Sequence, residues 1–470
     1  MEATGIISNV SRNITSCPAV ESAECDQRRL RPRPSIFSLE RGGGLKRGAA
    51  RLVHASNCIA GGAAGMQTMG EVNLRIPADS RGRFGSYGGQ FVPETLITPL
   101  RKLEDAFSKL IEDSSFQMEL QVLLRDYAGR ESPLYYAEKL SNYYKEVGAG
   151  VEIYLKREDL IHTGSHKINN AIGQALAAKK LGYEHAVAAT GAGQHGVAAA
   201  AACARMGLSC TVFMGTRDME RQPHNLLQMR TLGAEVRSVE GNFKDAASQA
   251  IREWVSNLDT SFHLSGSLVG PHPCPSMVGE FQSVIGKEVR KQATERWGAG
   301  KLPDVVLACV GSGSNAMGIF SEFLGDQKVR LIGVEAAGLG LGSGRHSATL
   351  ARGEVGVFHG SMSYLLQDDY GQMTDPHSIG VGLEYPGVGP QLSFLKDIGR
   401  VEYYTVTDAE AVNAFKRLCA LEGIIPALEA SHALAFLDKL CPQLPHGSRV
   451  VVNISGRGDK DAEMVLHHIQ

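Results

Sequence analysis

The chain of 470 residues has a formal net charge of −2, with 43% hydrophobic and 21% charged residues. This composition is ordinary for a globular enzyme, and the near-neutral charge gives no indication of binding to nucleic acid or to an anionic membrane. No apolar stretch approaches the roughly 20 residues of a membrane span. The nine cysteines form no CxxC pair, which disfavours a disulfide framework or a metal cluster.

Residues 1–72 differ in composition from the rest of the chain. They carry many arginines and several serines, and they show no sustained hydrophobic periodicity. This pattern predicts an organellar transit peptide of the plastid type, which would direct the protein to the chloroplast stroma. The alternative interpretation is a disordered N-terminal tail, in which case we expect a cytoplasmic protein.

Helical and strand patterns alternate from Arg83 onward. Apolar spacing predicts amphipathic helices over 96–110 and 116–127. Short apolar runs then alternate with helical segments, which favours parallel sheets covered by helices on both faces. The predicted strands are 151–155, 185–189, 209–214, 305–310, 331–335 and 450–454. We expect an α/β fold of two domains, over 73–284 and 285–470, with a cleft between them.

Three stretches of the chain carry groups with a chemical use. Lys167 lies among small and polar residues just before a helical pattern over 171–181. The turn Gly311–Asn315 joins a predicted strand to a helix start, where free backbone N–H groups can hold a phosphate. Ser455 directly follows the last predicted strand. A Schiff-base amine, a phosphate site and a partner for a ring nitrogen are what pyridoxal 5'-phosphate needs.

Further motifs extend along almost the whole chain. They occupy Phe84–Glu94, Leu155–Leu160, Thr190–Gly196, Gly270–Pro273, Glu422–Glu429 and Ser455–Asp461. Together with the segment around Lys167, and in this order, they resemble the beta subunit of tryptophan synthase, a fold-type II pyridoxal phosphate enzyme, most closely in its plant form. The resemblance covers the chain from about Arg83 to its end. It implies condensation of L-serine with indole to give L-tryptophan.

The resemblance also implies partners and a second cofactor. Indole would arrive from an alpha subunit, in a heterotetramer built on a beta homodimer. Lys244 matches the family lysine that pairs with the alpha subunit. A monovalent cation would be a further cofactor, for which the sequence assigns no ligands. Nucleic acid and membrane are not expected partners.

The same resemblance assigns roles to individual residues. Lys167 would bind the cofactor as a Schiff base and move protons at the serine alpha carbon. The remaining cofactor contacts would be His166, Gly311, Ser312, Gly313, Ser314, Asn315, Glu429 and Ser455. The serine carboxylate would be bound by Thr190, Gly191, Ala192, Gly193, Gln194 and His195, with Glu384 in the segment that closes the site. Without the resemblance, each stretch would also fit an ordinary glycine turn, helix cap or surface residue.

The chain departs from the family pattern at its catalytic elements. Ala189 stands where the family has a glutamate that assists departure of the serine hydroxyl, and a positioned general acid–base typically contributes roughly 10²–10⁴-fold in rate. Ser165, Ser312, Cys274 and Gly279 also differ from the family residues. Two alternatives to a working synthase therefore stay open. One is a catalytically impaired subunit that binds and activates the alpha subunit for indole release; the other is a serine beta-elimination enzyme.

Overall fold

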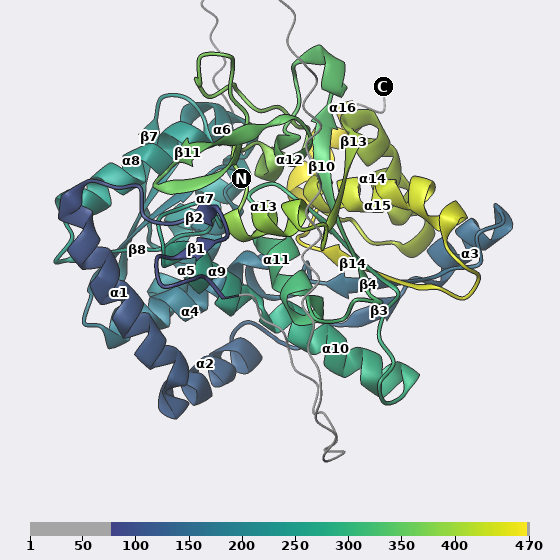
Figure 1. The fold of residues 1–470 in the computed structure, drawn as a ribbon, viewed down its shortest axis with the longest axis horizontal. Helices are drawn as coiled ribbons and strands as arrows, with labels where there is room; N and C mark the ends of the chain where they lie inside the picture. The colour runs from purple at the N-terminus through teal and green to yellow at the C-terminus, as the bar shows by residue number, and fades with distance from the viewer. Residues whose placement is uncertain (1–76, 468–470) are drawn as a thin grey trace, which may run out of the picture. The chain divides into compact units, whose positions relative to one another are not determined.

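The computed structural model describes residues 77–467 (Figure 1). The predicted transit peptide over 1–72 lies outside the described residues. Two parallel sheets occupy opposite sides of the view in Figure 1, each with its own helices. The predicted α/β fold of parallel sheets with helices on both faces is confirmed.

The larger sheet has six strands. In spatial order they are β13 (Glu402–Thr407), β10 (Arg330–Gly338), β9 (Val305–Cys309), β14 (Arg449–Ile454), β4 (Glu152–Arg157) and β3 (Leu134–Tyr136). All neighbours are parallel except β3 and β4. Alternate residues of β9 enter opposite cores: Val305 and Leu307 pack on one face, Val306 and Ala308 on the other. Both faces are therefore buried, which explains the continuous apolar runs.

The smaller parallel sheet has four strands. They are β7 (Glu235–Val239), β6 (Ser209–Gly215), β5 (His185–Thr190) and β8 (Ser261–His263). The helices α4 (Lys167–Lys180) and α5 (Gln194–Met206) cover one face, and α8 (Phe243–Ser256) covers the other. A capping box in which Asn242 and Asp245 bond each other's backbone amides fixes the start of α8.

A third, antiparallel sheet was not predicted. Its strands are β1 (Arg83–Phe84), β2 (Tyr87–Gly88), β12 (Ser361–Leu365) and β11 (Glu354–Phe358). The remaining helices are α1 (Glu94–Glu112), α2 (Ser114–Asp126), α3 (Glu138–Glu146), α6 (Thr216–Arg221), α7 (Pro223–Thr231), α9 (Cys274–Gln282), α10 (Val284–Trp297), α11 (Ser314–Phe320), α12 (Thr349–Arg352), α13 (Pro390–Asp397), α14 (Asp408–Glu422), α15 (Leu428–Leu440) and α16 (Ala462–His467). Strands as short as β1 and β2 carry no periodicity that a sequence pattern could reveal.

The start of one predicted helix differs from the structure for a physical reason. The helix expected over 171–181 begins at Lys167, because Ile168 is buried and Asn169 and Asn170 have tertiary hydrogen-bond partners that override their low helix propensity. The boundary at 284/285 stays a prediction, but strand pairing crosses it. Strands β3 and β4, from the predicted N-terminal domain, complete the sheet formed by β9, β10, β13 and β14.

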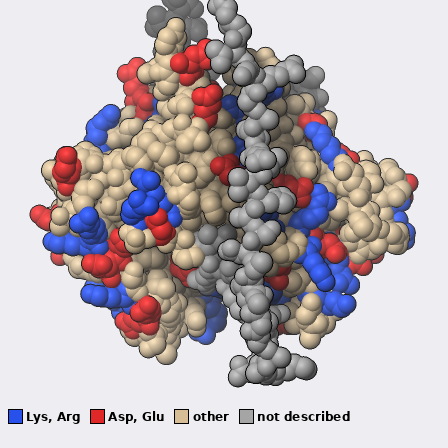
Figure 2. All heavy atoms as spheres, in the orientation of Figure 1, with Lys and Arg blue, Asp and Glu red and all other residues tan. Residues whose placement is uncertain are grey.

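Charged side chains of both signs are mixed on the described surface (Figure 2), in agreement with the near-neutral net charge. Figure 2 shows Lys and Arg interspersed with Asp and Glu on the face that it displays. Between residues 77 and 467, no helix combines the length and the apolar character that crossing a membrane requires.

Candidate active site

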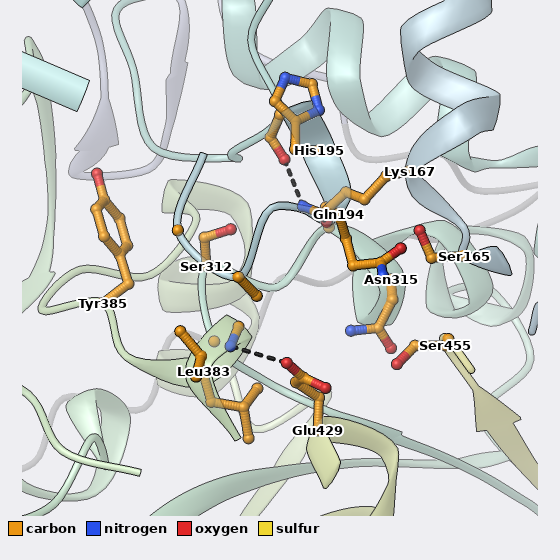
Figure 3. A pocket seen from close by; sticks show the side chains of 18 of the residues that line it. Ser165, Lys167, Gln194, His195, Ser312, Asn315, Leu383, Tyr385, Glu429 and Ser455 are labelled. Carbon is orange, nitrogen blue, oxygen red and sulfur yellow. Dashed lines mark hydrogen bonds between the residues drawn. The ribbon is translucent and has the colours of Figure 1, made fainter. Parts of the chain in front are cut away.

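One pocket collects most of the residues singled out in the sequence (Figure 3). Its walls include Thr190 at the end of β5, Cys309 at the end of β9 and Ser455 just after β14. Ligands of open α/β folds bind at the carboxyl ends of parallel strands, where the loops leave a crevice. The pocket therefore lies where this fold places a ligand.

Lys167 is the first residue of α4, and its amine reaches into this pocket (Figure 3). The Nζ atom donates to Gly266 O at 2.7 Å and to Ser314 Oγ at 3.0 Å. Both acceptors are uncharged, so they compensate a buried ammonium poorly. Burial lowers the pKa of Lys167 to about 8. A substantial fraction of this amine is consequently neutral slightly above neutral pH.

The hydrogen bonds beside Lys167 have a fixed direction. His166 Nδ1 lies 2.9 Å from Ser455 O, and a carbonyl can only accept, so Nδ1 carries the proton. Nε2 is then an acceptor for the Ser314 hydroxyl at 3.0 Å, which itself receives a hydrogen from Lys167. Burial, with a smaller contribution from Lys167, lowers the pKa of His166 to about 3. His166 is thus a neutral ring of one tautomer.

The turn Gly311–Asn315 requires glycine at two positions. Gly313 has φ +95°, and a Cβ there would lie 2.0 Å from Leu392 Cδ1, while at Gly311 it would lie 2.9 Å from Gly382 O. Ser312 fits without strain, because Thr163 and His359 are the only non-glycine residues with positive φ among those described. Asn315 anchors the turn by donating to Cys309 O at 2.9 Å.

Glu429, at the start of α15, is held as a carboxylate. It accepts a hydrogen bond from Gly382 N at 2.8 Å (Figure 3). It also accepts one from Lys460 Nζ at 3.0 Å. Burial opposes its ionisation, but the Lys460 ammonium and the backbone donors lower the pKa of Glu429. Lys460 also contacts Asp461 at 2.7 Å. A carboxylate with these partners has no proton to give. Lys460 was not predicted, although it stands in the Ser455–Asp461 motif.

The loop after β5 carries two buried polar atoms without a hydrogen-bond partner. Thr190 Oγ1 accepts from Gly196 N at 3.1 Å, which fixes the start of α5. His195 Nε2 donates to Leu264 O at 3.0 Å, so its Nδ1 is a bare acceptor. That Nδ1 and Gln194 Oε1 are buried without a partner. Gly191 and Ala192 also line the pocket, whereas Gly193, the left-handed residue that begins α5, does not.

Glu384 is not among the residues that line the pocket, and its expected substrate-binding role stays a prediction. Its carboxylate accepts from Arg221 Nη1 at 2.5 Å and from Ser378 N at 3.1 Å. The residues that flank it form the wall instead: Val381, Gly382, Leu383 and Tyr385. Sequence reasoning also missed Phe243, Gly266, Ser267 and Cys309. Gly266 and Ser267 follow the short strand β8, where no motif marks them.

Ala189 lies between the pocket and a second, adjacent cavity. The two cavities share Ala189, Phe243, Gly266, Ser267 and Tyr385. The second cavity continues along Ala247, Ile251, Val269, His263 and His359. Among the described residues that line either cavity, Glu429 is the only acid. Apart from Glu429, which is bonded to Lys460, the described lining thus contains no carboxylate that could act in place of the family glutamate at position 189.

The family follows from a comparison with known sequences. The sequence model for "Pyridoxal-phosphate dependent enzyme" matches residues 126–456. The chain belongs to the pyridoxal-phosphate dependent enzyme family. The matched range contains the motifs from Lys167 to Ser455, and the fold-type II architecture expected from the sequence is confirmed.

The fold is also similar to a solved structure of this type. A fungal L-serine ammonia-lyase from Rhizomucor miehei aligns with a TM-score of 0.56 and 20% sequence identity, covering 72% of this chain and 97% of that chain. At this identity the likeness shows the fold alone.

The residues of this pyridoxal-phosphate family member fit the cofactor. Buried polar atoms normally have hydrogen-bond partners. Three that line this pocket have none, namely Ser165 Oγ, Gln194 Oε1 and His195 Nδ1. The Lys167 ammonium also lacks a charged partner among its hydrogen bonds. The Ser165 hydroxyl and the Lys167 ammonium can donate to the anionic oxygens of pyridoxal phosphate, whereas Gln194 Oε1 and His195 Nδ1 accept only from a bound donor.

The lowered pKa of Lys167 predicts a pH-dependent stability for the cofactor-free protein. Below about pH 8 the amine is protonated in the folded and unfolded chains alike, so the cost of burying the ammonium is fully present. Between about pH 8 and 10.5 the folded chain releases the proton while the unfolded chain keeps it, and stability rises. We expect wild type to gain about 3 kcal/mol across this range relative to Lys167→Met. Urea unfolding of both proteins at either end of the range measures the gain, and parallel pH profiles would contradict it.

Proposed function

We propose that the chain is a tryptophan synthase beta-type enzyme, which joins the three-carbon unit of L-serine to indole to give L-tryptophan and water. The observation that supports this best is the pair of cavities that meet at Ala189. A replacement reaction needs room for a second substrate beside the amino acid. The second cavity has apolar walls, including Ile251 and Val269, next to the pocket that holds Lys167, and its volume of about 30 Å³ would have to grow by movement of these side chains to admit indole.

The pocket residues would divide the work. Bound pyridoxal phosphate supplies an electron sink that makes loss of a proton at the alpha carbon and of a group at the beta carbon feasible. Lys167 would hold the cofactor aldehyde and move the alpha proton, which its lowered pKa suits. The turn Gly311–Asn315 would bind the phosphate. The neutral Ser455 hydroxyl would face the ring nitrogen. The loop Thr190–His195 would orient the serine carboxylate.

Ala189 favours a second candidate, serine beta-elimination. The family glutamate is absent, and Glu429, the only acid in the described lining, is committed to Lys460. Departure of the serine hydroxyl would then rely on Lys167, and addition of indole would proceed without a free carboxylate in the described lining. Elimination needs only the first of these steps. A third candidate is a subunit that mainly activates an alpha subunit. It rests on Lys244, the second residue of α8, which pairs with Asp375 at 3.4 Å in this chain. The tryptophan synthase proposal also includes a heterotetramer with the alpha subunit, a monovalent cation as a second cofactor and a plastid location.

Product analysis separates these functions. The purified protein loaded with pyridoxal phosphate would be given L-serine and indole, with and without an alpha subunit, and assayed for tryptophan and for pyruvate. Tryptophan as the main product supports the synthase. Pyruvate as the main product replaces it with elimination. Neither product, together with faster indole release by the alpha subunit, would leave only the activating role.

A further inference from the structure

The wall segment, residues 377–385, forms one side of the pocket and is secured from outside it. Val381, Gly382, Leu383 and Tyr385 of this segment line the pocket. Its other end, at His377 and Ser378, contacts neither cavity. Contacts at this outer end therefore contribute to where the wall lies.

Asp408, the first residue of α14, provides two contacts to that outer end. Its Oδ1 accepts a hydrogen bond from Ile379 N at 3.0 Å. Its Oδ2 lies 3.2 Å from His377 Nε2, and the other nitrogen of that ring, Nδ1, lies 3.9 Å from Glu384 Oε1. The His377 ring therefore stands between the carboxylates of Asp408 and Glu384. Asp408 itself lines neither cavity.

The same carboxylate faces α15, the helix that begins beside the pocket. His432 Nε2 lies 3.8 Å from Asp408 Oδ1, and His432 Nδ1 donates to Leu428 O at 2.8 Å. Burial raises the pKa of Asp408, but His432, the Ile379 amide and His377 outweigh it and lower the pKa overall. Asp408 is thus an ionised group that accepts from the wall segment at Ile379 N, pairs with His377 of the same segment and lies near His432 of α15.

The wall and α15 meet at close range. Gly382 N donates to Glu429 at 2.8 Å, and a Cβ on Gly382 would lie only 2.7 Å from Glu429 Oε1. A shift of the wall by a fraction of this distance would break the contact or collide with Glu429. The position of the wall consequently controls the carboxylate that the pocket presents.

We propose that Asp408, together with His377, is a positioning residue that holds the wall segment against Glu429 and so sets the affinity of the pocket for its amino-acid substrate. The inference rests on the cofactor chemistry of the family and on L-serine as the substrate. It does not depend on which product is formed.

Glu410 offers a matched control on the same helix. It lies two positions after Asp408 in α14, closes the capping box with Thr407 and pairs with Lys439 at 2.7 Å. Its side-chain contacts in the described structure are with Thr407 and Lys439, which both lie outside the wall segment. Loss of Glu410 should therefore weaken the start of α14 without moving the wall.

The test is a titration of the cofactor-loaded protein with L-serine, followed by the change in the absorption of the bound cofactor. We expect Asp408→Ala to raise the L-serine concentration for half-maximal change by roughly tenfold, since a buried hydrogen bond to a charged group is lost. Asp408→Asn should recover most of the affinity, because an amide oxygen still accepts from Ile379 N. Glu410→Ala should lower the unfolding temperature comparably and leave the titration unchanged.

An unchanged titration for Asp408→Ala, or an equal shift for Glu410→Ala, would overturn the inference. Should Asp408→Ala fail to fold, His377→Leu takes its place. We expect it to raise the half-maximal L-serine concentration by a smaller factor, and an unchanged titration of this variant would also overturn the inference. If wild type gives no response to L-serine, the proposed function fails. The same variants are then compared by the rate of cofactor release, which should rise for Asp408→Ala and not for Glu410→Ala.

Discussion

Lys167→Ala is expected to remove the absorption band of bound cofactor and to lower turnover by about 10³-fold or more, since a covalent anchor and a proton carrier are lost together. Lys167 is the only lysine that donates to the phosphate turn, at Ser314 Oγ, in the part of the chain that is described. No other amine can take its place without moving an ion pair, because Lys460 is bonded to Glu429 and Asp461.

A second buried lysine serves as the control for this substitution. The Lys156 side chain is 0% exposed and pairs with Glu288 at 2.7 Å, away from the pocket. Lys156→Met should lower stability and leave the absorption band of the refolded protein in place. A Lys167→Ala protein that keeps a normal band and normal turnover would contradict the assignment of Lys167.

Ala189→Glu is expected to raise tryptophan formation by roughly 10²–10⁴-fold, the usual contribution of a positioned general acid–base. Position 189 lines both cavities, so a carboxylate there would face the amino-acid pocket and the second cavity together. The initial rate with L-serine and indole gives the measurement. Ala189→Gln, which has the same length without an exchangeable carboxyl proton, is the control and should give little gain.

The outcome distinguishes one missing group from several. If Ala189→Glu and Ala189→Gln behave alike, the absent carboxylate is not what limits the reaction. The other departures, such as Ser165 or Gly279, would then need reversal as well. If wild type already forms tryptophan rapidly, the expected gain disappears, and Lys167 would be sufficient for departure of the hydroxyl.

Much of the fold followed from local pattern. The strands beginning at His185, Ser209, Val305 and Arg449 are continuous apolar runs because both sheet faces are buried, and such runs can be read directly. The antiparallel sheet could not be predicted, since β1 and β2 are two residues long and pair with a distant hairpin. Nor could the pairing of β4 with β14, because strand order depends on contacts far apart in the sequence.

The sequence by itself determined the chemistry that this protein carries. Lys167, the glycine-shaped turn Gly311–Asn315 and Ser455 each follow local rules for what can start a helix or end a strand, and those rules hold without knowledge of the fold. Only the tertiary structure decided which groups are free to act. Glu384 forms an ion pair with Arg221, and Glu429 forms one with Lys460. Asp408 binds the wall segment at Ile379 N without lining the pocket itself. The ionisation and orientation of these carboxylates depend on neighbours brought together from distant segments, and no local pattern encodes such neighbours.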